Sequence, residues 1–464
     1  DDVESRGLGD VYKRQMFIRN RSLNATRVVA VSFAVIILVG ALLLTLPIAS
    51  RSGESAGFFT GLFTATSATC VTGLILVDTW TQWSLFGQVV ILAMIQLGGL
   101  GFMTVITLVS FALHRRIGLS ERLIMVSTLN LNDLDGVVRV VRHALMGTFL
   151  LEGIGAVILS ACMIPEFGIA GGIWRGIFHA VSAFCNAGFD LLGGRFGAFS
   201  SLVGYNDHPV VLLTIAALIM GGGLGFFVWE DILRKRSIHR LSVYSKMVLL
   251  MTALLIVGGA AFFLVEEYAN PATLGNMPFW QKLCNALFQS VTLRTAGFDA
   301  IGQGGLSDSS KAFSSILMLI GGSSGSTAGG LKTATVAVLL LALRSGLAGR
   351  EQVTFRGRTI PYRRVLNAMT LALVMLFLFL VGSMVISTVE GLPYLDCAFE
   401  VASAMGTVGL TTGLTPNLTP FSQTLIILLM YLGRVGVLSF SIALMTRGRT
   451  MDKIRYPEMN VMIG

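Results

Sequence analysis

Long apolar stretches alternate with short polar and basic segments along this 464-residue chain. Residues 28–48, 209–229, 247–265 and 365–389 contain no charged residue. A membrane-spanning helix needs roughly 20 apolar residues because the hydrocarbon layer is about 30 Å thick. The pattern therefore predicts membrane spans, with further apolar stretches at 79–113, 144–165, 312–343 and 421–446.

A short glycine-ended segment occurs four times in this pattern, at 67–74, 182–189, 291–298 and 403–410. Its glycines, Gly73, Gly188, Gly297 and Gly409, are 115, 109 and 112 residues apart. A stretch too short to cross a membrane precedes each segment, at 57–69, 173–184, 279–293 and 394–405. The alternative is four tight turns between ordinary spans, but four occurrences in register favour one structural unit copied four times.

This unit consists of a span, a half-helix, an extended loop and a second span. We predict an all-α integral membrane protein, with eight transmembrane helices and four re-entrant half-helices around one pseudo-fourfold pore. Non-helical backbone is tolerated at membrane depth only where it is buried in protein or lines a water-filled path. The expected repeats cover residues 16–113, 114–238, 239–346 and 347–464, and residues 1–15, which are polar and lack Met, are expected to be a non-native leader.

Composition supports this class. Hydrophobic residues make up 54% of the chain and charged residues 13%, which excludes a soluble domain of this length.

Basic residues concentrate at the chain ends and in the connections 115–142, 234–246 and 344–364. Because basic loops stay on the cytoplasmic side, these loops and both termini are expected there. The net charge of +9 is thus a topology signal, and no nucleic-acid partner is expected.

Chemistry follows from the loops. Glycine accepts backbone angles that turn successive carbonyl oxygens toward an axis, and rings of carbonyls replace the hydration shell of a cation. The negative end of each half-helix dipole also favours a cation. No histidine or cysteine grouping suggests a catalytic or metal cluster, so no enzymatic activity is expected.

A second glycine-rich run, residues 321–333, interrupts the apolar stretch after the third segment. Each glycine costs a helix about 1 kcal/mol, so we expect a broken helix here. The alternative is a helix crossing that is packed closely through small residues. Neither this run nor 221–225 fits a Walker or dinucleotide motif, so no nucleotide is expected on this chain.

These residues carry a family resemblance. Thr72-Gly73-Leu74, Asn186-Ala187-Gly188-Phe189, Arg294-Thr295-Ala296-Gly297-Phe298 and Gly406-Thr407-Val408-Gly409-Leu410 resemble the selectivity filters of the Trk/Ktr/HKT superfamily of cation transport proteins. The family has an arginine at the place of Arg434, which the run Tyr431-Leu432-Gly433-Arg434-Val435-Gly436 matches, and the resemblance, closest to the KtrB branch, covers residues 16–464.

The resemblance implies roles for individual residues. Twelve residues would form a potassium filter: Val71, Thr72, Gly73, Asn186, Ala187, Gly188, Thr295, Ala296, Gly297, Thr407, Val408 and Gly409. Ten would form an intramembrane gate: Gly321, Gly322, Ser323, Gly325, Ser326, Thr327, Gly329, Gly330, Lys332 and Arg434. Apart from the resemblance, a buried arginine needs a carboxylate, so Arg294 and Glu400 are expected to pair behind the filter as its support. Asp190 and Asp299 are expected to face the outer mouth and attract cations.

The resemblance also implies the setting. It suggests a potassium-translocating subunit of a Ktr-type uptake system in the bacterial plasma membrane, working as a homodimer with a cytoplasmic nucleotide-binding ring. No covalently bound cofactor is expected, potassium is the transported ion, and sodium is a candidate activator. A TrkH-like symport subunit and a secondary carrier are the alternatives, and Glu152 is either a coupling site or a buried hydrogen-bond partner.

Overall fold

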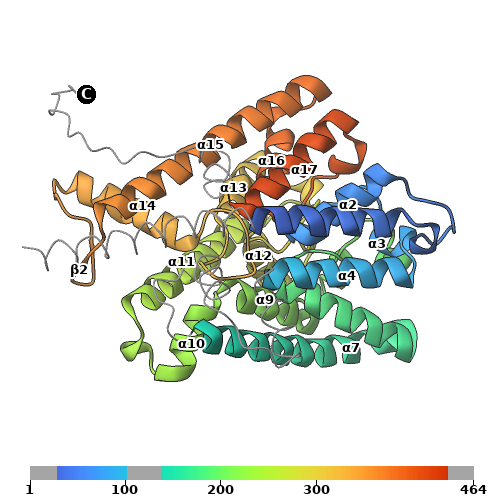
Figure 1. Cartoon of the computed structure of the whole chain (residues 1–464), viewed down its shortest axis with the longest axis horizontal. Helices are drawn as coiled ribbons and strands as arrows, with labels where there is room; N and C mark the ends of the chain where they lie inside the picture. The colour runs from blue at the N-terminus through green and yellow to red at the C-terminus, as the bar shows by residue number, and fades with distance from the viewer. Residues whose placement is uncertain (1–28, 102–136, 437–464) are drawn as a thin grey trace, which may run out of the picture.

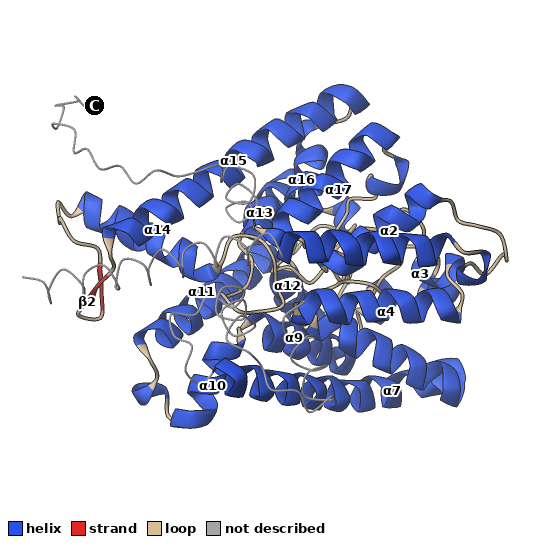
Figure 2. Ribbon diagram, viewed as in Figure 1, coloured by secondary structure: helices blue, strands red, loops and turns tan. Residues whose placement is uncertain are grey.

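The computed structural model describes residues 29–101 and 137–436 as a bundle of helices with one small hairpin (Figure 1). Helices account for nearly all the regular structure in this part of the chain (Figure 2). Its two strands, β1 (Thr354–Phe355) and β2 (Arg358–Thr359), pair antiparallel in the connection between two long helices. The mainly helical fold that the apolar pattern predicts is confirmed, while the expected leader and the C-terminal tail lie outside the described residues.

The helices follow one another with short connections. Serine caps begin several of them: Ser84, Ser242 and Ser307 each accept a hydrogen bond from the backbone N–H three residues later. In chain order the helices are Val29–Thr45, η1 (Pro47–Ala49), α2 (Phe58–Cys70), α3 (Thr79–Gln82), α4 (Leu85–Leu100), α7 (Val137–Phe184), α8 (Gly193–Phe196), η2 (Val203–Tyr205), α9 (Pro209–Gly223), α10 (Phe226–Lys235), η3 (Ile238–Arg240), α11 (Val243–Glu266), α12 (Phe279–Thr292), η4 (Gln303–Gly305), α13 (Asp308–Leu319), α14 (Thr333–Leu347), α15 (Tyr362–Glu390), α16 (Tyr394–Gly406), η5 (Thr415–Asn417) and α17 (Pro420–Val435).

Three of the described helices are long and apolar enough to cross a membrane: most of α7, α11 and α15. The bent pair α9 and α10 is a fourth if it counts as one span. Shorter apolar helices are Val29–Thr45, α4, α14 and α17. The chain is therefore an integral membrane protein by the length and composition of its helices.

Four half-helices lie where short apolar stretches are expected. They are α2, α12, α16 and the part of α7 that follows a kink at Gly168, where φ is 71°. The expected ends at 69, 184, 293 and 405 each fall within one residue of the observed ends. The helix break expected at 321–330 is also present, because α13 ends at Leu319 and α14 begins at Thr333.

One predicted span is wrong in its geometry. Residues 209–229 read as a single straight crossing, but the chain bends by 95° between α9 and α10. Gly225, at the start of α10, has a φ of 86°, which L side chains rarely adopt. The apolar pattern continues unbroken through this bend, so hydropathy alone does not reveal it.

A recurring Gly-x-x-Gly spacing explains where these helices end. Its second glycine, at Gly101, Gly225 and Gly436, has a positive φ and stops or bends the helix. Its first glycine packs directly on the main chain of a half-helix. A Cβ on Gly98, Gly222 or Gly433 would lie 2.0, 1.9 or 2.2 Å from the carbonyl oxygen of Thr69, Phe184 or Met405, respectively. Each of these carbonyls is four residues before a repeated glycine, so three of the helices brace equivalent points.

The buried core surrounds the half-helices. One apolar cluster joins the Val29–Thr45 helix, α2, α4 and α15 to α17. A second joins α7, α9 and α12, and a third joins α11, α12, α13 and α16. Figure 1 shows α10 and the β1–β2 hairpin at the same end of the bundle, so the basic connections 234–246 and 344–364 share one side.

The Gly222 contact predicts a specific loss of stability. Gly222→Ala forces a methyl group against the Phe184 carbonyl, and overpacking of this kind typically costs about 1–3 kcal/mol. We expect a lower melting temperature in detergent. Gly258→Ala in α11 is the matched control, because nothing lies within 4 Å of its Cβ and alanine favours a helix. Equal melting temperatures for the two variants would contradict the contact.

Candidate functional site

Four loops at the ends of the half-helices share one backbone geometry. We call them glycine loops 1 to 4, residues 71–73, 186–188, 295–297 and 407–409. The first residue of each is left-handed although it is not glycine: φ is 56° at Val71, 60° at Asn186, 66° at Thr295 and 52° at Thr407. The glycine that ends each loop also has a positive φ, and the residue between them does not. This alternation lets neighbouring carbonyl oxygens face one side of the chain.

The four glycine loops meet in a closed ring. A Cβ on Gly73 would lie 2.5 Å from the carbonyl oxygen of Ala187 in loop 2. A Cβ on Gly188 would likewise lie 2.8 Å from the carbonyl oxygen of Ala296 in loop 3, and one on Gly297 would lie 2.2 Å from the carbonyl oxygen of Val408 in loop 4. Gly409 closes the ring, because its Cβ would lie 2.1 Å from the carbonyl oxygen of Thr72. Four segments that are far apart in the sequence thus surround one axis in chain order.

Serine side chains fix the loops to their own half-helices. Ser67 and Ser403, each six residues before the glycine of its loop, accept a hydrogen bond from that glycine's N–H at 3.0 Å. Ser182 has the same position and donates to the Phe189 carbonyl at 2.8 Å. Beside loop 3, the hydroxyl of Thr292, five residues before Gly297, donates to the Phe298 carbonyl at 2.7 Å. Sequence reasoning missed these residues, although serine opens three of the four repeated segments.

The segment between α13 and α14 lies directly under the glycine loops. A Cβ on Gly329 would lie 2.0 Å from the Thr407 hydroxyl, and one on Gly321 would lie 3.3 Å from the Thr295 methyl group. The Thr327 hydroxyl donates to the Phe184 carbonyl at 3.1 Å and lies 3.2 Å from the Asn186 amide. This segment, residues 320–332, therefore touches the first residue of loops 2, 3 and 4, and we call it the crossing segment.

Backbone hydrogen bonds attach the crossing segment to the bend between α9 and α10. The N–H groups of Ser323 and Thr327 donate to the carbonyls of Gly223 and Gly222 at 3.0 and 3.2 Å. The N–H of Phe226 donates to Gly325 at 3.0 Å. Three backbone hydrogen bonds therefore join the start of α10 and the end of α9 to the crossing segment.

Arg434 joins the crossing segment to α4. Its guanidinium donates to the carbonyl oxygens of Thr327, Gly98 and Gly99. Lys332 lies in the same region, and its ammonium group donates to the Ala328 carbonyl at 2.7 Å. The two positively charged side chains predicted for the gate, Arg434 and Lys332, therefore both contact main-chain oxygens of the crossing segment, which lies next to the glycine loops.

The predicted pair of Arg294 and Glu400 is not formed. Glu400 accepts hydrogen bonds from the hydroxyls of Thr411 and Thr415 and from the N–H of Thr412, at 2.6, 2.5 and 2.9 Å. Arg294 Nε has no hydrogen-bond partner among the described residues. Glu400 binds these threonines because they follow loop 4 directly, and so it anchors the chain that leaves that loop.

Comparison with known proteins identifies the fold. Residues 12–447 match the family model described as "TrkH: Cation transport protein". The chain belongs to this family. It is 44% identical over 452 residues to the potassium/sodium uptake protein NtpJ of Enterococcus hirae, covering 96% of this chain and 98% of that protein.

Two further relatives extend the likeness. The Ktr system potassium uptake protein B of Bacillus subtilis is 38% identical over 438 residues, with 94% of this chain and 96% of that protein covered. The crystal structure of the potassium transporter TrkH from Vibrio parahaemolyticus matches with a TM-score of 0.69 at 17% identity, covering 91% of this chain and 85% of that one. The match to this crystal structure shows that the chain has the fold of TrkH.

The three acidic residues that the sequence singles out near the glycine loops, Asp299, Asp190 and Glu152, form hydrogen bonds with neighbouring groups. Asp299 was expected at the outer mouth, and its carboxylate accepts from the N–H groups of Ile301, Gly302 and Gln303. Asp190 is only 6% exposed and accepts from the Leu192 N–H at 3.0 Å. Glu152 accepts from the Gln96 amide at 3.1 Å. The first two carboxylates therefore order the chain that follows loops 2 and 3.

The ring predicts different effects for two glycines with the same backbone angle. Gly409 and Gly413 both have a φ of 97°, but only Gly409 faces another loop; nothing lies within 4 Å of a Cβ on Gly413. Both Ala substitutions carry a similar left-handed strain of about 1–2 kcal/mol. Only the Gly409→Ala methyl group also overlaps the Thr72 carbonyl, and overpacking of this kind typically costs about 1–3 kcal/mol. We therefore expect Gly409→Ala to reduce cation uptake by cells lacking other potassium systems about tenfold, since 1.4 kcal/mol corresponds to a factor of ten. Gly413→Ala should retain uptake, and similar losses in both would argue against the ring.

Proposed function

We propose that this chain is the potassium-translocating membrane subunit of a Ktr-type uptake system. The single observation that carries the proposal is the closed ring, in which each loop glycine lies against a carbonyl of the next loop. Carbonyl rings are the groups that potassium filters use in place of water. The names of two relatives, a Ktr system potassium uptake protein B and a potassium/sodium uptake protein, support potassium as the main ion.

The twelve residues of the four glycine loops would form the filter. The hydroxyls of Thr295 and Thr407, the first residues of loops 3 and 4, are buried and have no hydrogen-bond partner among the residues that the structure describes. Buried polar atoms normally have a partner, so a hydrated cation or water below the filter fits these two groups. Potassium would enter from outside under the membrane potential, which supplies about 2.3 kcal/mol per charge per 100 mV.

The crossing segment and Arg434 would form the gate. The segment lies under three of the loops, so a cation leaving the filter would meet it. Arg434 and Lys332 would add a positive barrier at the same level. Opening then requires the crossing segment to leave its hydrogen bonds with Arg434 and with the α9–α10 bend.

We further propose eight transmembrane helices in four repeats with the boundaries 16–113, 114–238, 239–346 and 347–464. The four half-helices would enter and leave the membrane from the outer side. Basic connections at the end that carries α10 and the β1–β2 hairpin support a cytoplasmic position for that end (Figure 1). The bacterial plasma membrane is the corresponding location.

The partners would be a second copy of this chain and a cytoplasmic nucleotide-binding ring. The name "Ktr system" of one relative supports a system of several components. The basic end would contact the ring, and the link from α10 to Gly325 offers a route from that contact to the gate. The nucleotide would bind the ring rather than this chain, and sodium is a candidate activator because one relative's name includes it.

Cation selectivity tests the proposed function. We expect proteoliposomes containing the full chain to take up potassium and rubidium faster than sodium and lithium, because the carbonyl ring replaces the hydration shell of the larger ions. Uptake is measured with each ion at equal concentration, and liposomes without protein are the control. Faster sodium than potassium uptake, or uptake of no cation both with and without the cytoplasmic partner, would reject the proposal.

The Arg434 contacts predict a leak. Hydrogen bonds from a charged group contribute about 1.5–3 kcal/mol, so Arg434→Gln should raise the released fraction of the crossing segment about tenfold or more. We expect faster potassium flux in proteoliposomes without the partner ring. Arg344→Gln is the control, because Arg344 lies in the exposed last turn of α14. Unchanged or slower flux through a well-folded Arg434→Gln protein would remove Arg434 from the gate.

A further inference from the structure

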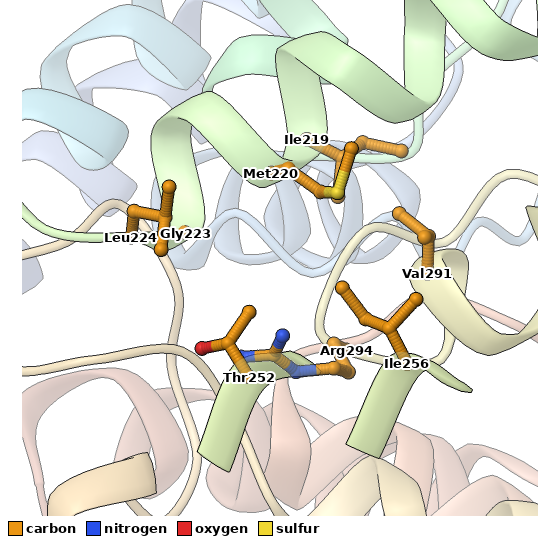
Figure 3. Close-up of a pocket in the computed structure, with 8 residues that line it drawn as sticks. All are labelled: Ile219, Met220, Gly223, Leu224, Thr252, Ile256, Val291 and Arg294. Atoms are coloured by element: carbon orange, nitrogen blue, oxygen red, sulfur yellow. The ribbon is translucent and has the colours of Figure 1, made fainter. Parts of the chain in front are cut away.

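A cavity lies behind glycine loop 3, between α9, α11 and α12 (Figure 3). It is small: its volume is about 10 Å³, roughly enough for a single water molecule or small ion. Its apolar walls include Ile219 and Met220 of α9, Ile256 of α11 and Val291 of α12. Two polar side chains, Arg294 and Thr252, lie side by side at the cavity, opposite Ile219 and Met220. The cavity is thus an apolar chamber with one cation and one hydroxyl.

Neither polar side chain is hydrogen-bonded within residues 29–101 and 137–436. Arg294 is 8% exposed and Thr252 is 9% exposed, and neither Arg294 Nε nor the Thr252 hydroxyl has a hydrogen-bond partner in the described part of the chain. The carboxylate expected to neutralise Arg294, that of Glu400, is occupied by three threonines. A buried charge without a counter-charge is strongly unfavourable.

Main-chain oxygens near the cavity already have donors. The Met220 carbonyl accepts from the Leu224 N–H at 3.0 Å. The Gly222 and Gly223 carbonyls accept from Thr327 and Ser323 of the crossing segment. The end of α9 therefore already uses these oxygens to hold the bend and the crossing segment, and the guanidinium makes no hydrogen bond to them.

From this arrangement we infer that the cavity binds a small monovalent anion of the chloride class, held by Arg294 and Thr252. The guanidinium supplies one positive charge and N–H donors, and the hydroxyl supplies a further donor. A divalent phosphate would exceed the single charge and would need more donors than these two side chains offer. The apolar walls favour a weakly hydrated, spherical ion that makes few hydrogen bonds.

The inferred site bears on transport and rests on the function proposed above. Arg294 directly precedes Thr295, the first residue of glycine loop 3. A bare guanidinium at this position repels cations in the loops, and the repulsion acts through a poorly screening protein interior. A bound anion neutralises it. The anion would therefore act as an activator of potassium flux from within the protein, without itself crossing the membrane.

Binding is tested first and without any transport assay. The melting temperature of the purified full chain is measured in detergent while chloride replaces gluconate at constant ionic strength. We expect a saturable rise for the wild type, because an ion that binds the native state stabilises it. The rise should be absent in Arg294→Gln and should need a several-fold higher chloride concentration in Thr252→Val. Arg344→Gln and Thr370→Val, which change exposed side chains, are the matched controls.

Flux is tested second, with potassium uptake into proteoliposomes in chloride or in gluconate. We expect uptake several-fold faster in chloride for the wild type and equal in both anions for Arg294→Gln. If Arg294→Gln does not fold, Thr252→Val decides through its shifted chloride dependence. Equal melting temperatures in the two anions would overturn the site, whereas a chloride-dependent melting temperature without any cation uptake would reject only the proposed transport function.

Discussion

Four stretches of non-helical backbone can lie among apolar helices only if their polar groups are satisfied within the protein, and the rest of this structure depends on that constraint. The ring meets it by placing each loop against the next one. Ser67, Ser182 and Ser403 hold the loops from behind, and the first glycines of the Gly-x-x-Gly pairs brace the half-helix ends. Since no loop glycine has room for a Cβ, the ring tolerates very little displacement of any one loop.

The same constraint shapes the chain that follows glycine loop 3. Whereas α4, α9 and α17 each pack a glycine on a half-helix just before they end, the chain between α13 and α14 forms the crossing segment. Its backbone groups are satisfied by the α9–α10 bend and by Arg434, and its Thr327 hydroxyl donates to the Phe184 carbonyl. The segment is therefore stabilised by partners from three other parts of the chain: carbonyls and one N–H group of the α9–α10 bend, the Arg434 guanidinium and the Phe184 carbonyl.

Much of this could be predicted from the sequence because the signals are local and repeated. The half-helix ends fall within one residue of the expected positions, and the glycine-rich break lies where helix propensity places it. The 95° bend after α9 was not predictable from hydropathy, because the residues on both sides of Gly225 are apolar. The Arg294–Glu400 pair was wrong because Glu400 has nearer partners: the threonines that follow loop 4 are only 11 to 15 residues away along the chain and occupy its carboxylate. The serines were overlooked although their recurrence at one position was visible.

The crossing segment reaches three of the four glycine loops by itself. An assembly of four identical chains would have to fit four such segments into the same space, where their backbones would overlap. Joining the four loop-bearing units, each a half-helix with its glycine loop and flanking helices, in one polypeptide removes this difficulty. One unit can then change its sequence while the other three keep theirs. A single obstruction on an otherwise symmetric axis is thus a property that gene duplication and fusion make possible and that symmetric self-assembly does not.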